Sequence, residues 1–93
     1  MKKFAKQITG EDNVATCVAD LTKGEEVFVK LDGKENSYHA NSNISFGHKI
    51  ATKDIKKGES IFKYGTEIGF ATQDIKTGDW VHTHNVKDNY EVK

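Results

Sequence analysis

The hydrophobic positions of this chain alternate with polar positions over short stretches, which is the period-two pattern of β-strands. The clearest case is residues 26–31, where Val27, Val29 and Leu31 fall on one face. Residues 4–8 and 14–19 are two further strand candidates. No stretch has the spacing of a convincing amphipathic helix. The pattern therefore predicts an all-β domain with short turns and little helix.

An eight-residue motif occurs three times, at residues 20–27, 54–61 and 74–81. Each copy has an acid, an aliphatic residue, two polar residues, a glycine, another acid and then a β-branched residue two places on. This order is typical of a strand, a tight turn whose glycine adopts positive φ, and a returning strand. The copies begin 34 and then 20 residues apart, which is too irregular for a solenoid.

The segments between the copies give weaker signals. Asp32-Gly33 is a good turn, but the polar stretch after it does not predict a simple hairpin, so we expect a polar loop or extension at about residues 32–46. Residues 64–67 predict a two-residue hairpin turn with Gly65 first. We expect one domain over residues 1–93, ending in a short tail at residues 87–93.

Composition limits the function classes. Fourteen Lys and Arg residues balance fourteen Asp and Glu residues, so charge gives no reason to expect a nucleic-acid partner. No apolar run approaches the roughly 20 residues of a membrane span, and the first residues lack the apolar stretch of a secretory signal. The single Cys17 lies in an apolar stretch and predicts a core residue in a reducing compartment. We therefore expect a cytoplasmic protein that binds neither nucleic acid nor membrane.

The last copy ends in two histidines, His82 and His84, which on a strand would point to the same face. Two imidazoles on one face could share a metal ion, a substrate anion or a proton. When the second copy is laid on the third, these histidines stand where Phe62 and Tyr64 stand. If Val81 is a core residue, the histidines point away from that core, toward solvent or a partner.

Several blocks of sequence, in the same order, resemble the SAF domain of altronate and galactarate dehydratases. The resemblance runs from about residue 12 to residue 85 and rests on Asp12-Asn13-Val14-Ala15, Gly47-His48-Lys49-Ile50-Ala51, Asp54-Ile55, Gly58-Glu59, Lys63-Tyr64-Gly65, Ile68-Gly69, Ile75, Gly78 and Val81-His82-x-His84-Asn85.

This resemblance implies a β-clip fold and a partner. In that family the SAF domain precedes a much larger catalytic domain, in the same chain or as a separate small subunit. The chain resembles such a small subunit, as in altronate dehydratase or sulfolactate lyase, and is then not active alone. The enzyme eliminates water or sulfite from a sugar acid or related hydroxy acid. The resemblance also implies that a divalent metal (iron, manganese or magnesium), shared with the large subunit, assists this elimination.

Such an elimination needs a base for the α-proton, groups that hold the developing negative charge, and an acid for the leaving group. Histidine can serve as acid, base or metal ligand, and lysine can bind a carboxylate as a point charge. The candidate catalytic residues are His48, His82 and His84; His82 and His84 are also the candidate metal ligands; Lys49, Lys63, Tyr64 and Asn85 are the candidate substrate-binding residues.

Two other functions fit the same residues. One is a non-catalytic SAF module that binds a small anion or a carbohydrate. The other is a structural adaptor whose histidines do no chemistry. Trp80 and Phe62 fit either a partner surface or the core, and unpaired strand edges would allow copies of the chain to associate.

Overall fold

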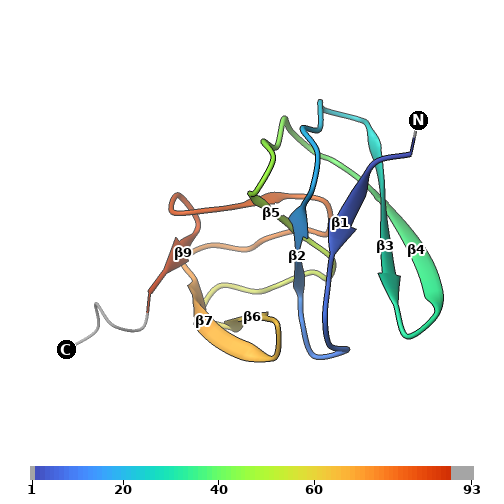
Figure 1. Cartoon of the computed structure of the whole chain (residues 1–93). Helices are drawn as coiled ribbons and strands as arrows, with labels where there is room; N and C mark the ends of the chain where they lie inside the picture. Colours follow the sequence, from blue (N-terminus) through green and yellow to red (C-terminus); the bar gives the residue numbers. More distant parts are fainter. Residues whose placement is uncertain (1, 89–93) are drawn as a thin grey trace.

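The computed structural model describes residues 2–88, and all the regular structure in that range is β-strand. Nine strands form a six-stranded sheet of order β4-β3-β1-β2-β5-β8 and a three-stranded sheet of order β6-β7-β9 (Figure 1). Their bounds are β1 Phe4–Lys6, β2 Val14–Cys17, β3 Glu26–Leu31, β4 Lys34–His39, β5 Lys49–Ala51, β6 Ser60–Lys63, β7 Thr66–Ala71, β8 Trp80–Val81 and β9 Val86–Lys87. The all-β prediction is confirmed, and the arrangement is consistent with a β-clip.

Strands β3 and β4 form the hairpin that the sequence did not predict. Asp32 and Gly33, with φ of 52° and 78°, make the two-residue turn, and the pairing runs from Glu26 opposite His39 to Leu31 opposite Lys34. Within the polar loop or extension expected at about residues 32–46, residues 34–39 form strand β4 and residues 40–46 lie outside the strands. Because β4 lies at a sheet edge with mostly exposed side chains, it lacks the apolar face by which strands are recognised.

The hairpin of β6 and β7 was predicted, but its loop consists of Tyr64 and Gly65, with φ of 55° and 77°. Gly65 is thus the second loop residue and not the first. The loop between β1 and β2 holds this hairpin in place: Oδ1 of Asp12 accepts the Gly65 N–H at 2.7 Å, and Oδ1 of Asn13 accepts the Phe62 N–H at 2.8 Å.

The motif has a fourth copy, at residues 43–50, in which Asn43 and His48 replace the two acids. Its turn closes like the others, with the His48 N–H donating to the Ser45 carbonyl at 2.9 Å. Gly47 adopts a φ of 86°, close to the 90° of Gly24 at the equivalent position. Each copy is also preceded, three residues before its first position, by a buried small residue: Cys17, Ala40, Ala51 and Ala71.

The four copies pack as two pairs. The first pair is joined by an antiparallel bridge between Leu21 and Ile44, and the second by one between Ile55 and Ile75. In the second pair, Asp54 accepts the backbone N–H of Thr77 at 2.8 Å, and Asp74 accepts that of Lys57 at 2.9 Å. Each turn is therefore capped by the copy opposite it.

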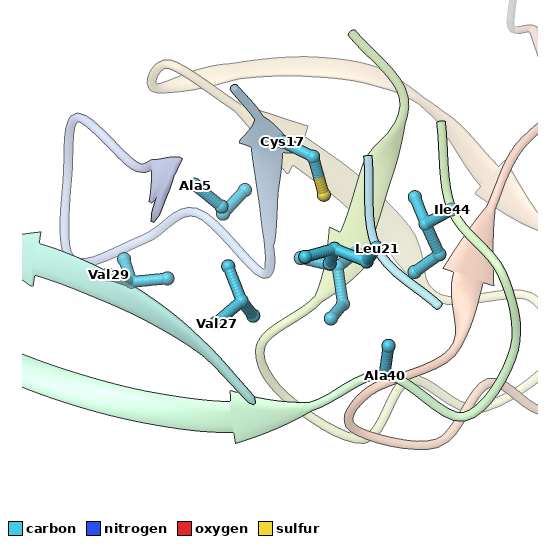
Figure 2. Close-up of a cluster of buried hydrophobic side chains, with 9 residues drawn as sticks. Ala5, Cys17, Leu21, Val27, Val29, Ala40 and Ile44 are labelled. Carbon is cyan, nitrogen blue, oxygen red and sulfur yellow. The ribbon is translucent and has the colours of Figure 1, made fainter. Parts of the chain in front are cut away.

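Each pair has its own hydrophobic core, built from the same motif positions. The first core, which Figure 2 shows in part, contains Cys17, Leu21, Val27, Ala40, Ile44 and Ile50. The second contains the equivalent residues Ala51, Ile55, Ile61, Ala71, Ile75 and Val81. Cys17 is fully buried, and burial raises the pKa of its thiol to about 11, which suits the predicted core role and not a nucleophile.

Two further predictions concern membrane spans and the end of the chain. No helix within residues 2–88 is long and apolar enough to cross a membrane. Of the predicted tail, Lys87 belongs to β9, and residues 89–93 lie outside the described range.

Candidate functional site

The pairing of β5 with β8 brings the separate histidine motifs together. Lys49 lies opposite Val81 and Ile50 opposite Trp80, so continuing the antiparallel register by one residue sets His48 opposite His82. The two imidazole rings are indeed stacked, with centroids 4.4 Å apart. Two residues 34 positions apart in sequence thereby share one side of the β5–β8 ladder.

The strand that was expected to carry both His82 and His84 ends at Val81, and residues 82–85 form a turn. The Asn85 side chain makes this turn: its Oδ1 accepts the His82 N–H and its Nδ2 donates to the Trp80 carbonyl, each at 2.9 Å. The expectation that His82 and His84 share a strand face is therefore wrong, because alternation does not continue through a turn.

The indole ring of Trp80 lies beside the imidazole rings of three histidines. Its ring centroid is 4.5 Å from that of His84, 5.5 Å from that of His82 and 5.9 Å from that of His48. The indole Nε1–H also donates a hydrogen bond of 3.1 Å to Nδ1 of His48. Trp80 is half-buried and packs against the first core, which anchors this aromatic cluster to the domain.

A cleft of about 620 Å³, which we call the histidine cleft, opens beside His82. This volume is in the usual range for small-molecule sites. Its apolar lining comes from Ile68 and Val86. Its polar lining comes from Lys49, Thr72, His82, Thr83, Lys87 and Asp88. Two lysines, one aspartate, two hydroxyls and an imidazole thus surround an apolar wall, and the lysines and hydroxyls suit a small molecule that carries carboxylate and hydroxyl groups.

His84 faces a different hollow. That hollow, about 230 Å³, is lined by Trp80, His84 and Asn85 together with Asp74 and Asp79. His84 is exposed, whereas His82 is half-buried. The two histidines therefore lie against one indole but open onto separate spaces.

The charges around the histidine cleft are mostly positive. Burial lowers the pKa of His82, and the neighbouring His48, Lys49 and His84 lower it further. Burial likewise lowers the pKa of Lys49, and Lys63 adds to this effect. A bound anion would relieve the repulsion among these groups.

The other predicted site residues lie around this centre. Lys63 is close enough to Lys49 to lower the pKa of Lys49. The ammonium of Lys63 lies 5.1 Å from the ring centroid of Tyr64. Tyr64 is exposed, in the tip of the β6–β7 hairpin. Asn85 is buried, and its amide is engaged with backbone groups on both sides, which favours a role in positioning the histidine turn over direct contact with a substrate.

The described residues do not complete a metal site. No group of three or more His, Cys, Asp or Glu side chains within residues 2–88 could hold an ion. Nδ1 of His48 already accepts the hydrogen bond from Trp80, so in the neutral ring it is not free to bind a metal ion. His82 and His84 as metal ligands remain a prediction that requires further ligands from another domain or chain, and we derive no step through a metal ion.

The lining residues Thr72, Thr83 and Lys87 were not predicted from the sequence, and neither was the hydrogen bond between Trp80 and His48. The copy of the motif at residues 43–50 could have indicated that hydrogen bond. In this copy His48 takes the position that Glu25, Glu59 and Asp79 take in the others. Those acids accept the N–H of Thr22, Lys56 and Lys76 in their own turns. His48 instead directs its ring toward Trp80.

Residues 3–89 match the family model of the altronate/galactarate dehydratase SAF domain. The chain belongs to this family. The resemblance seen in its sequence blocks is thus confirmed over almost the whole chain, and the histidine cleft is a feature of a SAF domain.

The relatives include altronate dehydratases and a subunit of a sulfo-lyase. The SAF domain is 44% identical over 89 residues to altronate dehydratase of Bacillus subtilis (strain 168), which covers 96% of this chain and 17% of that protein. It is 42% identical over 78 residues to altronate dehydratase of Escherichia coli (strain K12), covering 84% of this chain and 15% of that protein. It is 39% identical over 59 residues to the (2R)-sulfolactate sulfo-lyase subunit alpha of Paracoccus pantotrophus, covering 63% of this chain and 88% of that subunit. The chain thus spans under a fifth of the dehydratases that it matches.

Proposed function

We propose that this SAF domain is the small subunit of a hydroxy-acid lyase and contributes the histidine cleft to an active site that a large dehydratase-type subunit completes. The proposed reaction eliminates water or sulfite from a sugar acid or related hydroxy acid. The relatives support this class, since two are altronate dehydratases and one is a subunit of a sulfo-lyase.

The observation that carries the proposal is the meeting of His48, Lys49 and His82 at one end of the β5–β8 ladder. These three groups are capable of acid–base chemistry or anion binding. His48 and Lys49 belong to the copy at residues 43–50, and His82 directly follows the copy at residues 74–81. In the other copies the residues equivalent to His48 are the acids that cap their own turns.

Each side chain has a chemical task in this proposal. Lys49 binds the substrate carboxylate, which offsets the positive charge around it. His82, whose lowered pKa favours the neutral imidazole near pH 7, is suited to accept the α-proton. Thr72 and Thr83 offer hydroxyls to the hydroxyl groups of the substrate. The large subunit supplies the remaining acid–base groups and any divalent metal.

Co-expression with a large dehydratase-type subunit tests the proposal. We expect a stable complex on pull-down, and turnover of an aldonic or aldaric acid or of sulfolactate only when both chains are present. Replacing His82 by alanine should lower kcat by about a hundredfold or more, the range of a lost general acid or base. Lys49→Ala should mainly raise KM.

Lys56 provides the matched control, since its side chain is exposed in a repeat turn and lines neither hollow. Lys56→Ala should leave both kcat and KM within twofold of the unmodified complex. The proposal is wrong if no complex forms with any such partner, or if the complex turns over with His82 and Lys49 both replaced.

The second candidate function is a binding module for a small anion, and the cationic lining of the histidine cleft favours it. It predicts that the domain alone binds a hydroxy acid such as galactarate, with an affinity that a large subunit does not change. Calorimetric titration with and without the partner separates the two functions.

A further inference from the structure

The contact between Trp80 and His48 determines where His48 carries its proton. The indole Nε1–H can only donate, so Nδ1 of His48, 3.1 Å away, must accept through its lone pair. A neutral imidazole has one N–H and one lone pair. The proton of neutral His48 therefore lies on Nε2, and no free lone pair remains on the ring.

We propose that Trp80 is a positioning residue that holds His48 as the Nε2–H tautomer, so that His48 offers the substrate a neutral hydrogen-bond donor and not a proton acceptor. The inference rests on the proposed function for its catalytic consequence, although the tautomer itself can be measured without any partner. It divides the roles of the stacked pair, with His48 as the donor and His82 as the base.

The surroundings of Trp80 support a positioning role because they fix the indole from several sides. Its backbone pairs with Ile50 in the β5–β8 ladder, and its carbonyl accepts from Nδ2 of Asn85 at 2.9 Å. The ring of His84 lies against it, with centroids 4.5 Å apart. An N–H held in this way has a fixed direction, which is what the selection of one tautomer requires.

The repeat gives independent support. The three residues equivalent to Trp80 in the other copies are Glu26, Lys49 and Ser60, and none has an indole. The residues equivalent to His48 are acids that cap their own turns. The copies at residues 43–50 and 74–81 thus depart from the common pattern together, at the two positions that are hydrogen-bonded to each other.

His82 differs from His48 although the rings are stacked. Within residues 2–88 the His82 imidazole nitrogens make no hydrogen bond, so a lone pair remains available. In an elimination, the α-C–H proton passes to such a lone pair while the carboxylate gains negative charge. An adjacent N–H donor then stabilises that charge.

The tautomer is tested by long-range ¹H–¹⁵N correlation spectra of the ¹⁵N-labelled domain, at a pH where His48 is neutral. We expect the Nε2–H pattern for His48, with Nδ1 shifted as a hydrogen-bond acceptor. Trp80 is the one tryptophan in the sequence, so its indole N–H gives a single resonance, which should exchange slowly with solvent. A His48 that carries its proton on Nδ1, or a mixture of tautomers, overturns the proposal without any variant.

Trp80→Phe removes the N–H and keeps an aromatic ring against the histidines. In this variant we expect a mixture of His48 tautomers and, in the assembled enzyme, a kcat lowered by about tenfold with little change in KM. An unchanged tautomer in a folded Trp80→Phe domain, or an unchanged kcat, also overturns the proposal.

Two conservative variants of His48 separate the functions of its nitrogens. Glutamine places an amide N–H near the position of Nε2, whereas asparagine places an amide oxygen near the position of Nδ1. The His48→Gln enzyme should therefore retain severalfold more activity than His48→Asn, and the reverse order contradicts a donor role. If no partner yields any lyase activity, the proposed function fails, and the tautomer measurement on the isolated domain still decides this inference.

Discussion

Asp20 and Asn43 cap each other's turns across the first pair of repeats. Oδ1 of Asp20 accepts the Phe46 N–H at 2.7 Å, and Oδ1 of Asn43 accepts the Lys23 N–H at 2.9 Å. Asp54 and Asp74 do the same in the second pair, so Asn43 performs the task of an aspartate. The domain is built from two similar pairs of turns, each fixed by reciprocal hydrogen bonds over its own core.

Replacing Asn43 tests this reciprocal capping. Asn43→Ala removes the acceptor and should lower the free energy of unfolding by about 1 kcal/mol. For a domain of this size, that corresponds to about 4–8 °C in Tm. Asn43→Asp keeps the acceptor and matches the other three copies, so it should stay within about 0.5 kcal/mol of the unmodified domain. Equal destabilisation by both changes, measured by urea unfolding, would contradict the capping role.

Much of this fold could be predicted from sequence because the motif carries local information. The buried aliphatic residues, such as Ile55 and Ile75, and the glycine turns follow from types and spacing alone. The copy at residues 43–50 was missed because neither Asn43 nor His48 is acidic, although its glycine and aliphatic positions are in place. The edge strand β4 was missed because packing does not demand an apolar face there.

The site could be predicted only in part. His48, Lys49 and His82 do come together, but the reason is the β5–β8 register, which depends on the pairing of two copies and not on local sequence. The end of strand β8 was hidden because residues 82–84 continue the alternation seen in the second copy. Only the hydrogen bonds of Asn85 to the backbone reveal the turn.

Two equivalent glycines give a second prediction. Gly24 and Gly78 have φ of 90° and 95°, so alanine strains the backbone at both, at a cost of about 1–2 kcal/mol. A Cβ at Gly24 meets nothing within 4 Å, whereas one at Gly78 would overlap the carbonyl oxygen of His39. Gly78→Ala should therefore cost about 1–3 kcal/mol more than Gly24→Ala in thermal or urea unfolding. If both variants lose the same free energy of unfolding, the His39 carbonyl shifts at little energetic cost and the prediction is wrong.

The stability of the domain should depend on the charge of Asp12, which is fully buried. Burial raises its pKa, but hydrogen bonds from the N–H groups of Gly65, Ile8 and Thr9 outweigh this and lower it below its usual value. A lowered pKa means that the ionised form stabilises the fold. This contribution is complete above about pH 4, the unfolded value, and is lost as the pH falls through the lower folded value.

Asp12→Asn should thus cost about 1–3 kcal/mol at pH 7, and the difference from the unmodified domain should narrow between about pH 4 and pH 2. Urea unfolding at several pH values measures this. Glu11→Gln removes a neighbouring exposed carboxylate and serves as the control, with little effect at any pH. A difference that stays constant down to pH 2 would show that shape, and not charge, sets the role of Asp12.

The turn at residues 82–85 provides the last prediction, because Asn85 supports both histidines without facing the histidine cleft. Asn85→Ala removes its bonds to the His82 N–H and the Trp80 carbonyl, and should lower the free energy of unfolding by about 1–3 kcal/mol. It should also separate the His48 and His82 rings, which NMR detects as smaller ring-current shifts. Gln73→Ala is the matched control, since the exposed Gln73 side chain donates a long hydrogen bond of 3.4 Å to the His84 carbonyl of the same turn, and it should cost less than about 0.5 kcal/mol. If Asn85→Ala unfolds more easily but keeps the ring-current shifts, Asn85 stabilises the fold without positioning the histidines.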